Sequence, residues 1–312
     1  MKSPSKTVPA TEQRNPRSRG LDRKSTREIL RILSREDARV PAAVAREIPA
    51  IARAVDEIAK ALRNGGRLIY AGAGTSGRLA VLDAAECPPT FGVRPRLVRA
   101  VIAGGRRALT QAVEGAEDST TRGKRDLAAL RVNRHDVVVG LSASGGTPYV
   151  LAALRYARSR GACTIGVTSN RRSPLARLAR IVIAPDAGPE AIAGSTRLKA
   201  GTAQKLVLNM LSTAAMVRFG CVYDNWMINL ALTNRKLRRR GLRILEEATG
   251  ASASAAAHAL RLAGHNLRVA LVMLKTSASA AVARASLDAA RGDLHKAFAA
   301  AVRSRRAPKA RK

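Results

Sequence analysis

The stretch RLIYAGAGTSGRLAVLDAA, residues 67–85, runs from an apolar segment through a glycine- and hydroxyl-rich turn into a helical pattern. A short apolar segment bounded by turn residues is typical of a buried strand, so residues 67–73 predict the first strand of a sheet. The spacing of apolar residues over 78–85 predicts a helix after it. A strand that enters a helix through a tight turn is one unit of an α/β fold.

Further apolar segments repeat this pattern along the chain. They are residues 97–104, 136–144, 163–170 and 181–187. Helical patterns separate most of them, notably over 120–130 and 148–160. Such alternation implies crossover connections and a parallel sheet with helices on its faces, and ligands of such sheets bind beyond the carboxyl ends of the strands. The sequence therefore predicts a three-layer α/β fold with its site at that edge.

Helical segments also lie on either side of the predicted sheet. Residues 26–33 and 42–62 carry apolar side chains at helical spacing and read as helices that lead into the core. From Leu198 onward the pattern is helical, with breaks near Gly250, Gly264 and Gly292. We expect a small helical C-terminal module after the sheet.

Length and cysteine content narrow the class of protein. A chain of 312 residues is long enough for one large domain with appendages. The three cysteines, Cys87, Cys163 and Cys221, are odd in number and far apart, which indicates neither a disulfide framework nor a zinc site. The first twenty residues hold no apolar leader, and no apolar run approaches the ~20 residues of a membrane span. We expect a soluble, unexported, cytoplasmic protein without a membrane partner.

The charge balance is strongly basic. Lysine and arginine number 56 against 22 aspartates and glutamates, which gives a formal charge of +34. A balance of this kind favours nucleic acid as a partner. However, the cations are spread along the chain, aromatic residues are only 3%, and no nucleic-acid motif accompanies them. We therefore expect a solvated basic surface that contacts nucleic acid only non-specifically.

Two glycine-rich loops follow predicted strands and open predicted helices. The first glycine loop, residues 72–78 (GAGTSGR), offers Gly74, Thr75 and Ser76, although tight packing explains many such turns. It is not a dinucleotide fingerprint, because its variable positions carry hydroxyls and no acidic residue ends the next strand, and it lacks the G-K-[ST] ending of a P-loop.

The serine loop, residues 142–147 (SASGGT), concentrates three hydroxyls around two glycines. Its candidate ligands are Ser142, Ser144, Gly145 and Thr147. Backbone N–H and hydroxyl donors of such a loop can hold a phosphate dianion, with the helix dipole balancing the charge. Two loops of this kind on one sheet favour ligand binding over simple turns.

Two acidic stretches lie near these loops. Glu86 belongs to DAAECPPT (83–90), where Pro88 and Pro89 predict the end of a helix, and Glu117 belongs to VEGAED (113–118). By position alone each carboxylate is more often a surface group or a helix cap than a catalyst. The four histidines show no metal-ligand spacing, so we expect a reaction without metal or cofactor.

The chain resembles the N-acetylmuramic acid 6-phosphate etherases of bacterial peptidoglycan recycling. The matching stretches are TEQRNPRSRGLDRKST (11–26), GRLIYAGAGTSGRLAVLDAAECPPTFGV (66–93), AVEGAEDS (112–119), DVVVGLSASGGTPYV (136–150) and GSTRLKAGTAQKLVLNMLST (194–213). They span most of the chain in the order of that family and are far more specific than either glycine loop.

The resemblance implies a sugar isomerase (SIS) domain over about 58–221, a homodimer, and cleavage of the D-lactyl ether of the substrate to N-acetylglucosamine 6-phosphate and D-lactate. Around that domain we expect a disordered or extended segment with a substrate-loop-like motif (1–20), entry helices (21–57), a helical module (222–302) and a basic disordered tail (303–312).

The resemblance also implies residue roles. Glu86 is expected to be the proton donor and Glu117 the second active-site carboxylate, acting as base. The hydroxyls of the serine loop are expected to bind the phosphate, and Thr75 and Ser76 the sugar. Lys199 or Arg197 could pair with the lactyl carboxylate, or both could be structural. Two other functions stay open: a non-catalytic sugar-phosphate sensor and an aldose-ketose isomerase.

Overall fold

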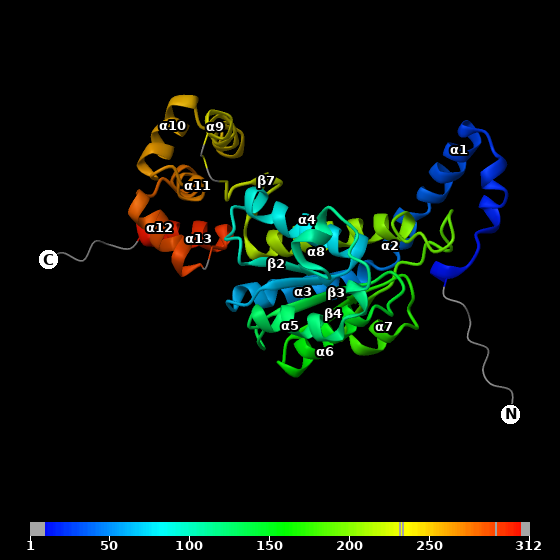
Figure 1. Cartoon of the computed structure of the whole chain (residues 1–312). Coiled ribbons are helices and arrows are strands. Elements are labelled where there is room, and N and C mark those ends of the chain that lie inside the picture. The colour runs from blue at the N-terminus through cyan, green and yellow to red at the C-terminus, as the bar shows by residue number, and fades with distance from the viewer. Residues whose placement is uncertain (1–9, 231, 233, 291, 307–312) are drawn as a thin grey trace. The chain divides into compact units, whose positions relative to one another are not determined.

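The computed structural model describes residues 10–230, 232, 234–290 and 292–306 (Figure 1). By its internal packing the chain divides into two compact units. The first comprises Met1–Ala85 and Pro95–Thr213, and the second comprises Glu86–Arg94 and Ala214–Lys312. The terminal stretches 1–9 and 307–312, on which part of the predicted disorder falls, lie outside the described residues.

The first unit is built on a parallel sheet, as predicted. Its strands are β1 (Leu68–Gly72), β2 (Val98–Ile102), β3 (Val137–Leu141), β4 (Cys163–Val167) and β5 (Ile181–Ile183), in the order β2-β1-β3-β4-β5. Each strand falls inside one of the five predicted apolar segments. All residues of β1 and β3 are buried, because the crossover helices cover both faces.

Helices lie on both faces of this sheet and complete the three layers (Figure 1). Helices α5 (Thr120–Ala129), α6 (Pro148–Ser159) and α7 (Pro174–Leu178) lie on one face, where Ile69 and Val138 of the strands join their core cluster. The alternate side chain Tyr70 points to the other face, covered by α4 (Gly74–Phe91) and α8 (Lys199–Phe219). There its hydroxyl donates to Asp83 Oδ2 of α4 at 2.8 Å.

The N-terminal part is more ordered than predicted. Residues 10–20 form short 3-10 turns, η1 (Ala10–Glu12) and η2 (Pro16–Ser18), and are followed by η3 (Leu21–Arg23), α1 (Thr26–Asp37), α2 (Val40–Ala45) and α3 (Ile48–Arg63). Within residues 10–20 the structure shows these turns, with extended backbone at Asn15 and Arg19, in place of a disordered segment. Tertiary hydrogen bonds explain the difference, since Asn15 donates to the carbonyl of Pro189 at 3.0 Å and Ser18 to that of Ala191 at 2.7 Å.

Helix α4 does not end where its prolines predict. It continues through Pro88 and Pro89 to Phe91. Each proline removes one bond to the preceding turn, but buried Cys87 and Phe91, four residues apart, anchor the same face of the last turn. The helix stops at Gly92, which adopts a left-handed φ of 60° and donates its N–H to the carbonyl of Pro88.

In its described residues the second unit is helical apart from a small antiparallel pair, β6 (Val222–Tyr223) and β7 (Trp226–Met227), which the sequence did not predict. Its helices are α9 (Arg235–Thr249), α10 (Ala253–Leu262), α11 (Leu267–Thr276), α12 (Ala280–Ala289) and α13 (Leu294–Arg306). The predicted breaks at Gly250, Gly264 and Gly292 are confirmed, and each of these glycines has a positive φ. Because α13 reaches Arg306, the predicted disordered tail is wrong for residues 303–306.

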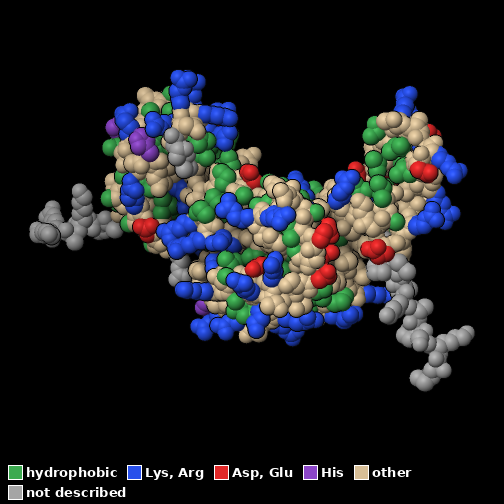
Figure 2. Space-filling model, in the orientation of Figure 1, with side chains coloured by type: hydrophobic (Ala, Val, Ile, Leu, Met, Phe, Trp, Pro, Cys, Tyr) green, Lys and Arg blue, Asp and Glu red, His purple; other side chains and the backbone are tan. Residues whose placement is uncertain are grey.

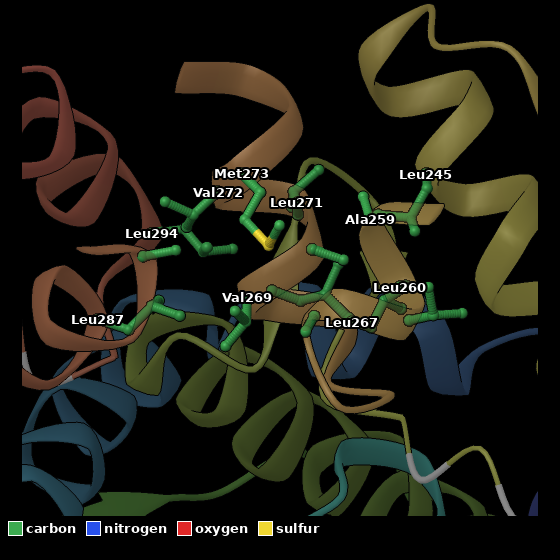
Figure 3. Close-up of a cluster of buried hydrophobic side chains, with 14 of the residues drawn as sticks. Leu245, Ala259, Leu260, Leu267, Val269, Leu271, Val272, Met273, Leu287 and Leu294 are labelled. Atoms are coloured by element: carbon green, nitrogen blue, oxygen red, sulfur yellow. The ribbon is translucent and has the colours of Figure 1, made fainter. Parts of the chain in front are cut away.

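Side chains of α11 form the centre of the C-terminal core (Figure 3). Leu271 and Val272 are fully buried there, and Leu245 of α9, Leu260 of α10 and Leu294 of α13 pack around them. Within the described part of the chain, no helix is long and apolar enough to cross a bilayer.

Candidate active site

The two glycine-rich loops lie side by side at the carboxyl edge of the sheet. Strands β1 and β3 are hydrogen-bonded neighbours, and their register places Gly72 next to Leu141. The first glycine loop leaves β1 at Gly72, and the serine loop leaves β3 at Leu141. The sheet therefore presents both sets of hydroxyls at one edge, where open parallel sheets bind ligands.

Hydrogen bonds within the serine loop fix its hydroxyls. The buried Oγ of Ser142 lies 2.8 Å from Thr147 Oγ1 and 3.4 Å from Ser144 Oγ. The same oxygen accepts the N–H of Gly145 at 3.0 Å, and Ser144 Oγ accepts the N–H of Gly146 at 3.2 Å. The buried hydroxyl of Ser142 thus holds the loop in place through these hydrogen bonds, whereas Ser144 and Thr147 remain partly open to solvent.

Gly145 is required by both backbone and space. Its φ is +69°, in the left-handed region. A Cβ at this position would lie 2.2 Å from Ser173 Oγ and 2.8 Å from Thr168 Oγ1, two residues that follow β4. The loop is also held from that side, because Thr168 Oγ1 donates to the carbonyl of Ala143 at 3.1 Å.

The serine loop delivers the chain into the N-terminus of α6. Thr147 is the N-cap, and its side chain makes no capping hydrogen bond. The first N–H groups of a helix lack intrahelical partners, and together with the helix dipole they attract anions. The loop therefore offers backbone donors and the hydroxyls of Ser144 and Thr147 to a ligand such as a phosphate, and it contains no lysine or arginine.

The first glycine loop brings its backbone close to its own helix. Gly74 is exposed with a φ of +51°, and a Cβ on Gly72 would lie 2.7 Å from the nitrogen of Gly77. Ser76 is buried and Thr75 half-buried. A Cβ added to Gly201 would lie 3.4 Å from the methyl group of Thr75, so the first turn of α8 is next to this loop.

Glu117 lies on the segment between β2 and α5. That segment contains η4 (Gly105–Leu109) and η5 (Ala116–Asp118), and Glu117 is exposed on η5. Arg78 holds the segment to the start of α4 by donating to the carbonyls of Leu109 and Gln111 at 3.2 and 3.0 Å. Buried Ala116 shares a core cluster with Tyr149 of α6. Element η5 packs against α6, so the backbone around Glu117 lies near the helix that the serine loop enters.

Glu86 is exposed on α4. It belongs to the second compact unit, whereas Glu117 and both loops belong to the first. The neighbouring residue Cys87 is buried, so the side of α4 that carries Cys87 packs inside the protein and the side that carries Glu86 faces solvent.

Lys199 is buried at the start of α8, with 1% of its surface exposed. Its Nζ donates to Glu36 Oε2 and, at 3.0 Å, to the carbonyl of Ala187. Glu36 is the one buried residue of α1, and Arg17 and Asn15 of the N-terminal segment donate to it as well. The ammonium of Lys199 is thus engaged within the protein, which favours the structural alternative for this residue.

This network holds an ionised carboxylate inside the protein. Burial acts to raise the pKa of Glu36, but hydrogen bonds from Arg17, Lys199 and Asn15 outweigh burial and lower the pKa to about 2. A buried charge persists only where it is paired and hydrogen-bonded. Glu36 consequently ties the N-terminal segment and α1 to the start of α8.

A second buried carboxylate, Glu190, caps α8. Its two oxygens accept the N–H groups of Lys199 at 3.0 Å and Ala200 at 2.9 Å, while burial raises its pKa. Next to it, the N–H of Gly194 donates to the carbonyl of Thr11 at 3.0 Å. The N-terminal segment therefore runs along the 190–194 segment, which follows β5 at the same edge as the two loops.

Sequence reasoning did not single out Glu36, Glu190 or Asp83. Asp83 lies three residues before Glu86 on α4, is partly buried, accepts hydrogen bonds from Tyr70 and Ser212, and has a pKa raised by burial. Glu36 lies on the polar face of an amphipathic helix, and the sequence pattern of such a face predicts exposure to solvent. Only the possible pairing of acidic residues with the basic segment TEQRNPRSRG could have indicated that Glu36 is buried.

The described residues contain no group of three or more His, Cys, Asp or Glu side chains that could hold a metal ion.

Comparisons with known proteins agree with this architecture. The family model described as SIS domain matches residues 115–214, and the one described as glucokinase regulatory protein N-terminal SIS domain matches residues 50–158. A phosphoheptose isomerase from Francisella tularensis shares the fold, with a TM-score of 0.51 and 20% identity over 62% of this chain and 100% of its own.

Two curated relatives are much closer in sequence. The N-acetylmuramic acid 6-phosphate etherase of Salmonella agona (strain SL483) is 53% identical over 288 residues, which is 92% of this chain and 97% of the relative. The protein of the same name from Actinobacillus pleuropneumoniae serotype 5b (strain L20) is 48% identical over 288 residues, covering 92% of this chain and 95% of its own.

Proposed function

This chain belongs to the N-acetylmuramic acid 6-phosphate etherase family, and we propose that it is the lyase that converts N-acetylmuramic acid 6-phosphate and water into N-acetylglucosamine 6-phosphate and D-lactate. The observation that carries this proposal is the sequence identity of 48% and 53% with the two etherases over 92% of this chain. The paired loops at the sheet edge support it, because they suit a sugar phosphate.

The reaction starts with the sugar ring open. The aldehyde at carbon 1 then acidifies the proton on carbon 2, and Glu117 removes that proton as general base. Lactate leaves from carbon 3 with the electron pair of the ether bond, and Glu86 donates a proton to the departing oxygen. The products of this step are an unsaturated aldehyde and lactate.

Water then adds to the unsaturated aldehyde with the proton transfers reversed. Glu86, now ionised, accepts a proton from the water that attacks carbon 3, and Glu117 returns a proton to carbon 2. Both carboxyl groups regain their starting states. Hydroxyl and backbone donors of Thr75 and Ser76 stabilise the enolate charge that develops on the aldehyde oxygen in both steps.

The serine loop holds the phosphate of the substrate. Ser144 and Thr147 donate from the solvent side, Ser142 orders both hydroxyls, and Gly145 permits the turn. This assignment rests on the uncapped N-terminus of α6 and on the loop hydrogen bonds. Gly74 of the neighbouring loop lets the sugar approach the backbone.

Lys199 acts as a positioning residue. Its buried ammonium joins Glu36, and through it the N-terminal segment, to the helix whose first turn lies next to Thr75. Arg197, which lies two residues earlier, is left to meet the lactyl carboxylate.

We also propose that the enzyme is a homodimer. Helix α1 carries apolar side chains, yet its only buried residue is Glu36, and Leu30 is 60% exposed. Ile48 at the start of α3 and Ile192 are 53% and 51% exposed. An apolar helix face left open by its own chain marks an interaction site, and a second copy presents the same face.

The cell compartment of such an enzyme is the cytoplasm, consistent with the absence of a disulfide among Cys87, Cys163 and Cys221. Lys and Arg side chains are scattered over the face shown in Figure 2 and do not converge on one stripe. Contact with nucleic acid is therefore non-specific.

Separate incubations with N-acetylmuramic acid 6-phosphate and glucosamine 6-phosphate test the proposed function. The lyase releases lactate from the first and leaves the second unchanged. Isomerisation of the second without lactate from the first would identify an aldose-ketose isomerase, and binding without any conversion would identify a sensor.

A further inference from the structure

A cavity of about 590 Å³ lies at the amino edge of the sheet, where none of the proposed substrate residues is found. Its lining comes from the end of α3, the turn before β3, the end of α6, and α7 with the residues after it. The floor is formed by Val137, Cys163 and Thr164 at the starts of β3 and β4. A volume of this size is within the range of small-molecule sites, ~300–1,000 Å³.

The cavity is distinct from the serine loop. Strand β3 runs from Val137 in the cavity to Leu141 before Ser142. At about 3.3 Å per residue, this strand separates the two sites by roughly 16 Å. A ligand at one edge therefore does not occupy the other.

Cations converge on this cavity from separate elements. Lys60 of α3, Arg134 of the turn, Arg158 of α6 and Arg177 of α7 line it, and all four are exposed. None of them forms an ion pair with a carboxylate in the part of the chain that the structure describes. Arg177 donates to the carbonyl of Arg172 at 3.0 Å, which leaves its charge without a carboxylate partner.

The acidic residues of the cavity are already matched. Asp136 is buried and pairs with Arg67 at 2.6 Å, and Glu57 pairs with Arg180 at 3.4 Å. The C-termini of α3 and α6 lie at this cavity, and the dipole of each helix places about half a negative charge at its C-terminus. They offset roughly one of the four cations, so a strong positive potential remains.

A chain with 56 lysines and arginines places cations on every surface, and charge alone does not define a site. Here the cations surround a hollow instead of a convex face. Low-dielectric walls focus the field of such a cluster, and only a ligand with several negative charges neutralises it. Phosphate groups suit it best, because guanidinium groups bind them with paired hydrogen bonds.

We propose that this cavity binds a small molecule carrying two or more phosphate groups through Lys60, Arg134, Arg158 and Arg177. The site is separate from the proposed active site, and its ligand is neither the substrate nor a product, each of which carries at most one phosphate.

The test uses tripolyphosphate as the probe and measures its affinity for the full chain by isothermal titration calorimetry. Lys60→Gln/Arg158→Gln is expected to weaken binding at least about tenfold, because two charge-assisted contacts are lost. The matched control is Arg53→Gln/Arg155→Gln, which removes the same charge from exposed positions on the same two helices outside the cavity. This control is expected to stay within about twofold of wild type.

Cys163 reports where the probe binds. It is half-buried in the cavity, whereas Cys87 and Cys221 are buried elsewhere. Saturating tripolyphosphate should slow the reaction of Cys163 with a thiol reagent, and it should still do so in Ser144→Ala/Thr147→Ala. Equal loss of affinity in both charge-matched pairs, or labelling of Cys163 at an unchanged rate, would overturn the proposal.

Discussion

At Gly145 the serine loop passes between Ser173 and Thr168 with no room for a side chain. Gly145→Ala should lower the free energy of unfolding by about 1–3 kcal/mol, because its Cβ meets Ser173 Oγ and its φ is positive. Gly146→Ala is the matched control. Its φ is not positive, and the nearest atom to its Cβ is Ser144 Oγ at 3.7 Å. Thermal unfolding compares the two, and equal stability would mean that the loop tolerates a side chain.

The two carboxylates are separated by isotope exchange. Glu86→Gln and Glu117→Gln should each lower lactate release by roughly 10²- to 10⁴-fold, the loss expected for a general acid or base. In heavy water Glu86→Gln can still exchange the carbon 2 proton of intact substrate, because proton removal precedes the departure of lactate. Glu117→Gln should lose both activities, since nothing else starts the elimination.

The opposite pattern would reverse this assignment. If Glu117→Gln still exchanges the proton and Glu86→Gln does not, Glu86 is the base and Glu117 the acid. Nuclear magnetic resonance of recovered substrate reads the exchange directly.

Among the elements, α1 depends on one buried carboxylate. The lowered pKa of Glu36 means that its ionised form stabilises the fold fully above its ordinary value of 4.5, and that this contribution is lost as the pH falls toward 2. Glu36→Gln should therefore lower the free energy of unfolding by about 1–3 kcal/mol at pH 7, a range that allows for screening of the ion pair by solvent. The difference should become progressively smaller below pH 5.

Denaturant unfolding of wild type and Glu36→Gln at several pH values measures this difference. Asp22→Asn removes an exposed carboxylate 3.8 Å from Arg23 and should have little effect at any pH. A difference between wild type and Glu36→Gln that does not shrink below pH 5 would contradict the buried ion pair.

The strands and their loops were predictable because their signals are local. Each strand is an apolar run, and each loop is marked by glycines and hydroxyls directly after one, so the edge at which they meet follows from parallel topology. The course of α4 through Pro88 and Pro89 was not predictable, because it depends on burial of Phe91. Order in residues 10–20 likewise depends on Glu36 and Pro189, which are remote in sequence.

At the scale of the whole molecule, the proposed homodimer is tested at the open face of α1. If this face forms the dimer interface, Leu30→Glu should weaken association at least about tenfold, because it places a charge among apolar side chains. Leu262→Glu is the matched control, since Leu262 is 55% exposed on α10. Sedimentation equilibrium gives both dissociation constants. A wild-type chain that sediments as a monomer, or a Leu30→Glu chain that remains fully dimeric, would contradict the use of α1.

The charge of +34 concerns the whole molecule as well. The family resemblance gave the activity, while composition alone pointed toward nucleic acid. Arg78 is the one lysine or arginine in the sequence of the two glycine-rich loops, so the other cations bear on solution behaviour and on other ligands more than on the sugar site.

The most direct test of the proposed lyase is the conversion of N-acetylmuramic acid 6-phosphate by the wild-type chain in heavy water. D-lactate should be released in equal amount to N-acetylglucosamine 6-phosphate, and the sugar product should carry deuterium at carbon 2, because hydration draws that hydrogen from a group that exchanges with solvent. Lactate release without deuterium at carbon 2 would contradict elimination and hydration, and no lactate release at all would contradict the proposed activity.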